Sequence, residues 1–360
     1  MRILQILSGT ELNGAVTYAF KLCELLTARG HEVLLLRRPY LDQNVPVAPA
    51  ARLVDSTLKR HVGEIRRIGA FCAQEKIDVI HTHMSSASAF GAVLRLFYRI
   101  PCVATAHKLN LQLHWAINDR VLCHNDESMR YMRRVNLVLP SRLKLVRPFL
   151  DERETDLPRE PRETTLQRLG LPLDRPILIT VGHFIPRKGL LDIADAMSRV
   201  AASGSDALMV FCGWSGEANY RAAVEARIAE HGLQSRVRWF TQLSDHDRVH
   251  LTRCADLFIQ ASHVETGPLS ALEAMAHGLP VVGTRCGTME DFIVPNVTGQ
   301  LVPVAQPQQL ADAIIGMLKD RDALKRKGNA GRQRFLDLFS ATANMGLIEQ
   351  AYRDAMARLQ

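Results

Sequence analysis

The chain has 360 residues, of which 47% are hydrophobic and 23% charged, and its formal net charge is +8 at pH 7. This composition excludes a disordered chain and allows two domains that each bury a core. Seven scattered cysteines without a CxxC pair argue against a disulfide framework or a zinc site. No stretch approaches the roughly 18–20 apolar residues of a membrane span, and the first apolar run is too short for a signal peptide. We therefore expect a cytoplasmic protein.

The first half of the chain alternates predicted strands with predicted helices. The expected strands are Ile3–Leu7, Glu32–Leu36, Val79–His81 and Pro101–Ala106. The expected helices are Ala15–Arg29, Thr57–Glu75 and Ser85–Arg95. Such alternation is typical of βαβ units and a parallel sheet.

The segment Asp151–Arg168 is rich in Arg, Glu and Pro, and it reads as an exposed connection or a short polar helix. We place the domain boundary there, between an N-terminal domain over 1–160 and a C-terminal domain over 170–340. A last helix over about 341–360 is expected to fold back on the first domain.

The second half repeats the alternation of the first. Its expected strands are Pro176–Val181, Ala207–Cys212, Val237–Phe240, Leu257–Gln260 and Pro280–Gly283. Its expected helices are Leu190–Ala202, Tyr220–His231, Leu269–His277, Pro307–Lys319 and Ala341–Leu359. The predicted fold class is α/β, with two Rossmann-like parallel-sheet domains and a ligand in the cleft between them, at the carboxyl ends of the strands.

Charge is distributed unevenly between the two halves. Residues 1–150 hold 21 Lys and Arg against 11 Asp and Glu, whereas the rest of the chain is slightly acidic. A basic face suits an acidic partner such as an anionic membrane surface, an anionic glycan or a nucleic acid. An ordinary solvated surface is the alternative interpretation.

The densest chemical signal is a pair of glutamates eight residues apart, Glu265 in a loop after a strand and Glu273 inside the next helix. Gly267 lies just before that helix, so the backbone amides of about Leu269 and Ser270 form an anion site. Each carboxylate can accept hydrogen bonds from the hydroxyls of a polyol. Taken along the chain, the loop glutamate, the helix amides and the helix glutamate match the order of a sugar, a diphosphate and a ribose. The alternative is a capping carboxylate followed by a surface glutamate.

The string ETGPLSALEAMAHGLPVV over 265–282 resembles the signature of the retaining glycosyltransferases of family 4, which have the GT-B fold. The resemblance implies that Glu265 contacts the donor sugar, Glu273 binds the ribose hydroxyls, and the amides of Leu269 and Ser270 bind the diphosphate. It implies a UDP- or GDP-linked sugar as donor and no cofactor. It also implies a glycan or lipid-linked acceptor, in the synthesis of bacterial cell-envelope polysaccharide or lipopolysaccharide, and no nucleic-acid partner. Peripheral contact with the inner face of an anionic membrane would then explain the basic first half.

The string VGHFIPRKG over 181–189 is similar to the family's loop that neutralises the donor diphosphate. Gly182 and Lys188 match the family pattern, but His183 stands where the family has an arginine. Three alternatives follow. His183 is protonated when the donor binds, Arg187 substitutes for the arginine, or the grip on the phosphates is weaker.

Four further positions resemble family sites. Gly14 precedes the first helix, at the place of a glycine-rich loop near the diphosphate, and His107 ends a strand where the family has a histidine facing the donor sugar. Gly213 and Gln242 each follow a strand and are expected near the donor base. We expect His107 to act in catalysis together with Lys188 and Glu265. His81 and His83 also end a strand, and a structural role is the simpler interpretation for them.

The tripeptide Asp245-His246-Asp247 spells the manganese motif of a different glycosyltransferase fold. It sits where a helix is expected to begin, and capping of that helix explains it better. We therefore expect no metal requirement.

The family pattern places no carboxylate as a nucleophile, so the resemblance implies front-face attack, with the leaving phosphate taking the acceptor proton. Two alternatives stay open, namely a nucleotide-sugar epimerase of the same fold and a catalytically silent nucleotide-sugar-binding protein. An NAD-linked oxidoreductase is disfavoured because no GxGxxG follows the first strand.

Overall fold

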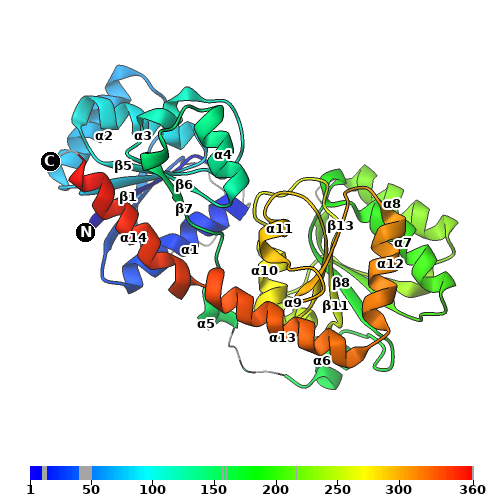
Figure 1. The fold of residues 1–360 in the computed structure, drawn as a ribbon. Helices are drawn as coiled ribbons and strands as arrows, with labels where there is room; N and C mark the ends of the chain where they lie inside the picture. Colours follow the sequence, from blue (N-terminus) through cyan, green and yellow to red (C-terminus); the bar gives the residue numbers. More distant parts are fainter. Residues whose placement is uncertain (10–13, 40–50, 156–157, 159, 216, 359–360) are drawn as a thin grey trace. The chain divides into compact units, whose positions relative to one another are not determined.

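The chain divides into two compact units. The computed structural model describes residues 1–9, 14–39, 51–155, 158, 160–215 and 217–358 (Figure 1). Unit 1 comprises Met1–Pro148 and Ala341–Gln360, and unit 2 comprises Phe149–Ser340. Each unit has its own parallel sheet, which confirms the predicted class of two Rossmann-like domains. None of the described helices is long and apolar enough to cross a membrane.

The sheet of unit 1 has seven parallel strands in the order β3-β2-β1-β4-β5-β6-β7. The strands are β1 (Arg2–Leu7), β2 (Glu32–Arg37), β3 (Arg52–Asp55), β4 (Val79–His83), β5 (Cys102–Thr105), β6 (Arg120–Cys123) and β7 (Leu143–Leu145). From β1 the chain moves towards one edge of the sheet, and from β4 towards the other. The carboxyl ends of β1 and β4 therefore form a switch point, where ligands bind in such sheets.

Helices cover both faces of this sheet. They are α1 (Gly14–Ala28), α2 (Val62–Gln74), α3 (Ser85–Tyr98), α4 (Asp126–Arg134), α14 (Ala341–Ala357) and the 3-10 turns η1 (Leu113–Ile117) and η2 (Pro140–Arg142). Leu4 and Ile6 of β1 pack towards α2 and α3, in one core with Ile68 and Phe90. Because side chains alternate along a strand, Gln5 points to the opposite face, where its amide bonds to Tyr352 of α14.

Two helix bounds in unit 1 differ from the sequence expectation. The helix expected from Thr57 begins only at Val62, since Ser56 and Leu58 form a turn and the His61 side chain caps the helix by accepting from the Glu64 amide at 3.1 Å. The helix expected to end at Arg95 continues to Tyr98 and ends on Arg99, in the left-handed region with φ 54°.

The sheet of unit 2 has six parallel strands in the order β10-β9-β8-β11-β12-β13. The strands are β8 (Ile177–Phe184), β9 (Leu208–Ser215), β10 (Val237–Phe240), β11 (Leu257–Gln260), β12 (Val281–Thr284) and β13 (Gly299–Val302). From β8 the chain moves to β9 and β10 on one side, and from β11 to β12 and β13 on the other. The switch point of this sheet is therefore between β8 and β11.

The helices of unit 2 form a layer on each face. They are α5 (Glu152–Thr155), α6 (Arg162–Arg168), α7 (Leu190–Ala202), α8 (Ala218–Glu230), α9 (Asp245–Cys254), α10 (Leu269–Ala276), α11 (Met289–Phe292), α12 (Pro307–Leu318), α13 (Arg321–Leu338) and the 3-10 turns η3 (Pro186–Lys188) and η4 (Gln234–Arg236). One core joins the sheet to α7, α8 and α12, and the other joins it to α6, α9, α10 and α13 (Figure 1). The polar segment Asp151–Arg168 contains the two short helices α5 and α6, with Leu166 fully buried.

Candidate functional site

The loops at the switch point of unit 2 bring Lys188 and Glu265 together. Lys188 ends η3, in the loop after β8, and Glu265 lies in the loop after β11. The Lys188 Nζ donates to Glu265 Oε1 at 2.6 Å, and Arg187 Nη1 lies 3.5 Å from Oε2. The family resemblance implied a phosphate contact for Lys188 and a sugar contact for Glu265, and it did not predict this pair.

The Glu265 carboxylate is held by more than its cations. The Ser262 hydroxyl donates to Oε1 at 2.8 Å and the Gln260 amide at 3.2 Å, and the residue is only 7% exposed. A carboxylate this buried is stable only when paired and hydrogen-bonded. The loop thus presents a pre-oriented acceptor beside the lysine head, whose side chain is itself only 13% exposed.

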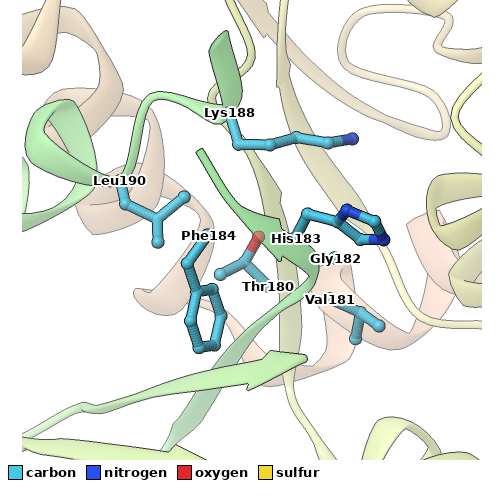
Figure 2. Close-up of a pocket in the computed structure, with 7 residues that line it drawn as sticks. All are labelled: Thr180, Val181, Gly182, His183, Phe184, Lys188 and Leu190. Atoms are coloured by element: carbon cyan, nitrogen blue, oxygen red, sulfur yellow. The ribbon is translucent and has the colours of Figure 1, made fainter. Parts of the chain in front are cut away.

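Two glycines let β8 and β9 end close together beside this pair. Gly182 and Gly213 are opposite each other in the register, with φ of +153° and +152°. A Cβ on Gly213 would lie 1.9 Å from the Gly182 carbonyl oxygen, so no larger residue fits. Figure 2 shows the small pocket at this strand end, lined by Gly182, His183 and Lys188 above the buried side chain of Phe184.

His183 occupies the position where the resemblance led us to look for an arginine. Its ring lies 4.4 Å from the ring of Trp214, its partner in the β8–β9 register. Burial lowers the pKa of His183, and the nearby charges of Lys188 and Arg187 lower it further. A lowered pKa leaves the imidazole neutral at pH 7, which argues against protonated His183 as the substitute cation.

The helix α10 begins where the sequence expected the anion site. Pro268 occupies its N-cap without a side-chain cap, and Gly267 precedes it. As the first two helical residues, Leu269 and Ser270 have amides with no intrahelical acceptor. The Ser270 hydroxyl reaches Gln260 Oε1 at 3.5 Å, so the start of α10 lies against the end of β11.

Glu273 is joined to a residue that sequence reasoning overlooked. Arg248 of α9 donates to Glu273 Oε2 at 2.5 Å. Burial opposes the charge on Arg248, but Glu273 outweighs it and raises the pKa of the guanidinium. An arginine directly after the Asp245-His246-Asp247 motif carried no sequence signal, because only the packing of α9 against α10 reveals the pair.

The Asp245-His246-Asp247 tripeptide forms the first turn of α9. The cap is Ser244, whose hydroxyl accepts from the Asp247 amide at 3.0 Å, so the cap lies one residue before the predicted motif. Asp247 pairs with Arg168, and Asp245 lies 3.5 Å from Arg248. Within the described ranges no group of three or more His, Cys, Asp or Glu could hold a metal ion. Gln242 lies in the turn between β10 and α9, where its side chain is exposed.

In unit 1, His107 lies among three other histidines at the carboxyl ends of β4, β5 and β6. His83 Nδ1 is 3.2 Å from His107 Nε2, and the ring centroids of His107 and His124 are 5.4 Å apart. His81 lies two residues before His83 on β4, where it is buried and hydrogen-bonds to Tyr352 and Thr105. The sequence pointed to His81, His83 and His107 separately and did not predict the cluster.

Burial lowers the pKa of all four histidines, and for His83 and His107 the neighbouring imidazoles lower it further. The cluster is therefore neutral at pH 7. Gly14 begins α1, and the described residues leave open space where a Cβ on it would lie. The residues 10–13 of the predicted glycine-rich loop lie outside the described residues.

Comparisons with known proteins match both halves of the chain to glycosyltransferase families. The family described as Glycosyltransferase Family 4 matches residues 12–154, and the family Glycosyl transferases group 1 matches residues 161–334. The chain is 27% identical over 316 residues to a D-inositol 3-phosphate glycosyltransferase of Corynebacterium glutamicum, covering 80% of this chain and 75% of the relative.

Two solved structures have the same fold. A sucrose-phosphate synthase from Thermosynechococcus elongatus matches with a TM-score of 0.83 and 24% identity, over 99% of this chain and 100% of its own. Anabaena HepE in complex with UDP matches with a TM-score of 0.84 and 18% identity, over 97% of this chain and 99% of its own. The chain belongs to the family 4 glycosyltransferases and has their GT-B fold.

Proposed function

From this family membership we propose that the protein is a retaining, metal-independent glycosyltransferase. It moves the sugar of a UDP- or GDP-linked donor to a glycan or lipid-linked acceptor in bacterial cell-envelope synthesis. The observation that carries the proposal is the Lys188–Glu265 pair at the switch point of unit 2, beside the start of α10. A cation, a carboxylate and helix amides without an intrahelical acceptor together match the charges and hydroxyls of a nucleotide sugar.

The donor phosphates and the Glu265 carboxylate compete for the same ammonium group. When the diphosphate binds, Lys188 turns its Nζ to the phosphate oxygens, where the amides of Leu269 and Ser270 add to the positive potential. Arg187, whose side chain is 51% exposed, supplies the second charge in place of the family arginine. Glu265 is then free to accept hydrogen bonds from the sugar hydroxyls while Ser262 and Gln260 keep it in position.

The nucleoside takes the remaining groups of the site. Glu273 accepts from the ribose hydroxyls, with Arg248 fixing the orientation of its carboxylate. Gly213 and Gln242, which lie at the ends of β9 and β10, border the base. The UDP in the HepE structure supports uridine as the first base to test, since that protein shares this fold.

The transfer step needs no carboxylate nucleophile in this proposal. The acceptor oxygen bonds to the anomeric carbon on the face that the diphosphate leaves, so the configuration is retained. The bond between the anomeric carbon and the phosphate oxygen breaks, and that oxygen takes the acceptor proton. Lys188 and the α10 amides stabilise the charge that develops on the leaving group. His107 is neutral in the histidine cluster, and in this proposal it hydrogen-bonds to a substrate hydroxyl.

An anionic or membrane-bound acceptor suits the surface of unit 1. Two loops are tied together because the Gln112 amide donates to Asn136 Oδ1 at 2.6 Å. These loops carry four exposed leucines, namely Leu111, Leu113, Leu137 and Leu139. Arginines 133 and 134 are exposed in the last turn of α4. Exposed apolar side chains beside basic ones favour contact with an anionic lipid surface. The inositol phosphate named for the Corynebacterium relative is also anionic.

A donor panel tests the proposal directly. UDP-glucose, UDP-galactose, UDP-N-acetylglucosamine and GDP-mannose are compared by thermal shift, because a ligand that binds only the folded state raises Tm with its concentration. Glu265→Gln should reduce the shift given by the best donor. Glu225→Gln, which changes an exposed glutamate on α8, should not. If no member of the panel stabilises the protein, the proposed function is wrong.

Turnover then separates the transferase from its two alternatives. With the best donor and a series of inositol phosphate, lipid-linked and glycan acceptors, a transferase releases nucleotide in an acceptor-dependent way. An epimerase converts the donor to another nucleotide sugar without any acceptor. A silent binding protein does neither. Proton NMR of the product reads the anomeric configuration, and an inverted product would refute the retaining mechanism.

A further inference from the structure

A continuous chain of hydrogen bonds runs along the face of the unit 1 sheet that α14 covers, and it ends on His107. The Gln5 amide nitrogen donates to the Tyr352 hydroxyl at 3.3 Å. The Gln5 carbonyl oxygen lies 2.7 Å from His83 Nε2. His83 Nδ1 in turn lies 3.2 Å from His107 Nε2. Gln5, His83 and Tyr352 are fully buried, whereas His107 is partly exposed, so among these four described residues His107 is the one that reaches the surface.

The direction of this chain fixes where the imidazole protons are. The Gln5 oxygen can only accept, so the Nε2 of His83 carries the proton and donates it. A neutral imidazole has one proton, so His83 Nδ1 is an acceptor and the proton between the two rings belongs to His107 Nε2. His107 Nδ1 is left with a lone pair, and among the described residues no protein group bonds to it. The orientation of one buried amide therefore decides the tautomer of a ring two hydrogen bonds away.

Packing keeps the rings neutral and in place. The Tyr18 ring meets the rings of His83 and His107 edge-on, with centroids 6.0 Å and 5.4 Å away. Burial lowers the pKa of both histidines, so the single-proton argument holds at pH 7. The Gln5 amide is itself oriented by the Tyr352 hydroxyl, which also lies 2.7 Å from His81 Nδ1.

A merely structural explanation accounts poorly for this arrangement. Buried polar chains are stable only when every member is satisfied, and apolar side chains would fill the same sheet face at lower risk. The neighbours of Gln5 on β1 are buried leucine and isoleucine residues. Among the buried residues of β1, Gln5 is the one polar residue, and it is the residue that leads to His107.

We propose that Gln5 and His83 are positioning residues that hold His107 with its proton on Nε2, so that its Nδ1 accepts a hydrogen bond from a substrate hydroxyl. The tautomer stands on the geometry of unit 1 alone. The clause on the substrate rests on the proposed function. The site would therefore require a hydroxyl that donates, and a fluorine at the same place on the sugar, which cannot donate, would not replace it.

The tautomer can be measured without any ligand. In protein with ¹⁵N-labelled histidine, long-range ¹H–¹⁵N spectra distinguish Nε2–H from Nδ1–H, and the His107 signals are assigned by their absence in His107→Asn. The wild type should show the Nε2–H form. Gln5→Met removes the acceptor and should give a mixture, whereas Gln5→Glu places a carboxylate that favours a doubly protonated His83 and should move the His107 proton to Nδ1. Leu4→Met, on the opposite face of β1, is the control for disturbed packing.

Kinetics with the best donor of the panel test whether His107 Nδ1 contacts a substrate hydroxyl. Gln5→Met should lower kcat about tenfold, as loss of one hydrogen bond in the transition state does, with KM for the donor and the calorimetric Kd for UDP unchanged. Gln5→Glu should not recover the loss, because it leaves His107 Nδ1 protonated. If Gln5→Met does not fold, Tyr352→Phe disturbs the same chain from its other end, and it should shift the tautomer in the same direction.

Each outcome decides one part of the inference. A His107 ring that is Nδ1–H in the wild type, or that does not respond to Gln5→Met or Tyr352→Phe, overturns the positioning role. A shifted tautomer with unchanged kcat overturns the hydroxyl contact of His107 and leaves the transferase proposal standing. A set of donor analogues, each with fluorine in place of a different sugar hydroxyl, gives a further test. If every analogue reacts as fast as the parent donor, the hydroxyl contact of His107 is overturned.

Discussion

Replacing Gly213 by alanine tests whether the close approach of β8 and β9 is required by the donor site. The new Cβ would lie 1.9 Å from the Gly182 carbonyl oxygen and 2.8 Å from its carbonyl carbon, both under the 3.0 Å that real Cβ atoms respect. The strand ends would have to part by about 1 Å. Forcing extra volume into a packed region costs roughly 1–3 kcal/mol. The φ of +152° adds roughly 1–3 kcal/mol for a residue with a side chain.

Gly204→Ala separates the two contributions. Gly204 has a φ of +86° and open space where a Cβ would lie, so its substitution carries only the backbone cost. Differential scanning calorimetry with and without UDP assigns the unit 2 transition. We expect Gly213→Ala to lose about 2–6 kcal/mol of stability and Gly204→Ala about 1–2 kcal/mol.

Only Gly213→Ala should also weaken UDP binding, because it displaces the β8 end that carries His183 and leads to Lys188. Equal losses of stability in the two variants, or unchanged UDP affinity in Gly213→Ala, would refute the reasoning.

Three further predictions concern charge and protonation. Burial lowers the pKa of His81 to about 3, so the contribution of neutral His81 to the stability of unit 1 is complete above pH 6.5. As the pH falls from 6.5 towards 3, that contribution is lost at about 1.4 kcal/mol per pH unit. Calorimetry between pH 7 and 5 should therefore show that stability declines less steeply in His81→Gln than in the wild type. Lys188→Met should raise the Kd for UDP about ten- to hundredfold and leave the Kd for uridine unchanged. Arg187→Met alters a more exposed side chain and should raise the Kd for UDP only a few-fold. Equal effects on the binding of UDP and uridine would contradict a role of these cations at the phosphates. Wild type should bind UDP more tightly than 2′-deoxy-UDP, and Glu273→Gln should remove that difference; a preference that survives in titration calorimetry would show that another group binds the ribose.

Much of the fold could be predicted from local pattern. Strands buried on both faces appear in the sequence as apolar runs, as β8 does, and the spacing of apolar residues marked α7 at its observed bounds. The strands β3, β6, β7 and β13 were not predicted. In β3 and β7 no residue is buried, so these two strands carry no apolar run of the kind that marks a buried strand.

The segment 265–282 was enough to indicate the family and the types of group that would bind a nucleotide sugar. This was possible because its loop, helix start and two carboxylates are close together in the sequence. Only the tertiary structure decided which groups act on one another. Lys188 and Glu265 are 77 residues apart, and Gln5 and Tyr352 are 347 apart. Their contacts depend on strand order, which places β8 beside β11 and packs α14 on the sheet of unit 1. Strand order is a property of the whole packed sheet, and no local pattern encodes it.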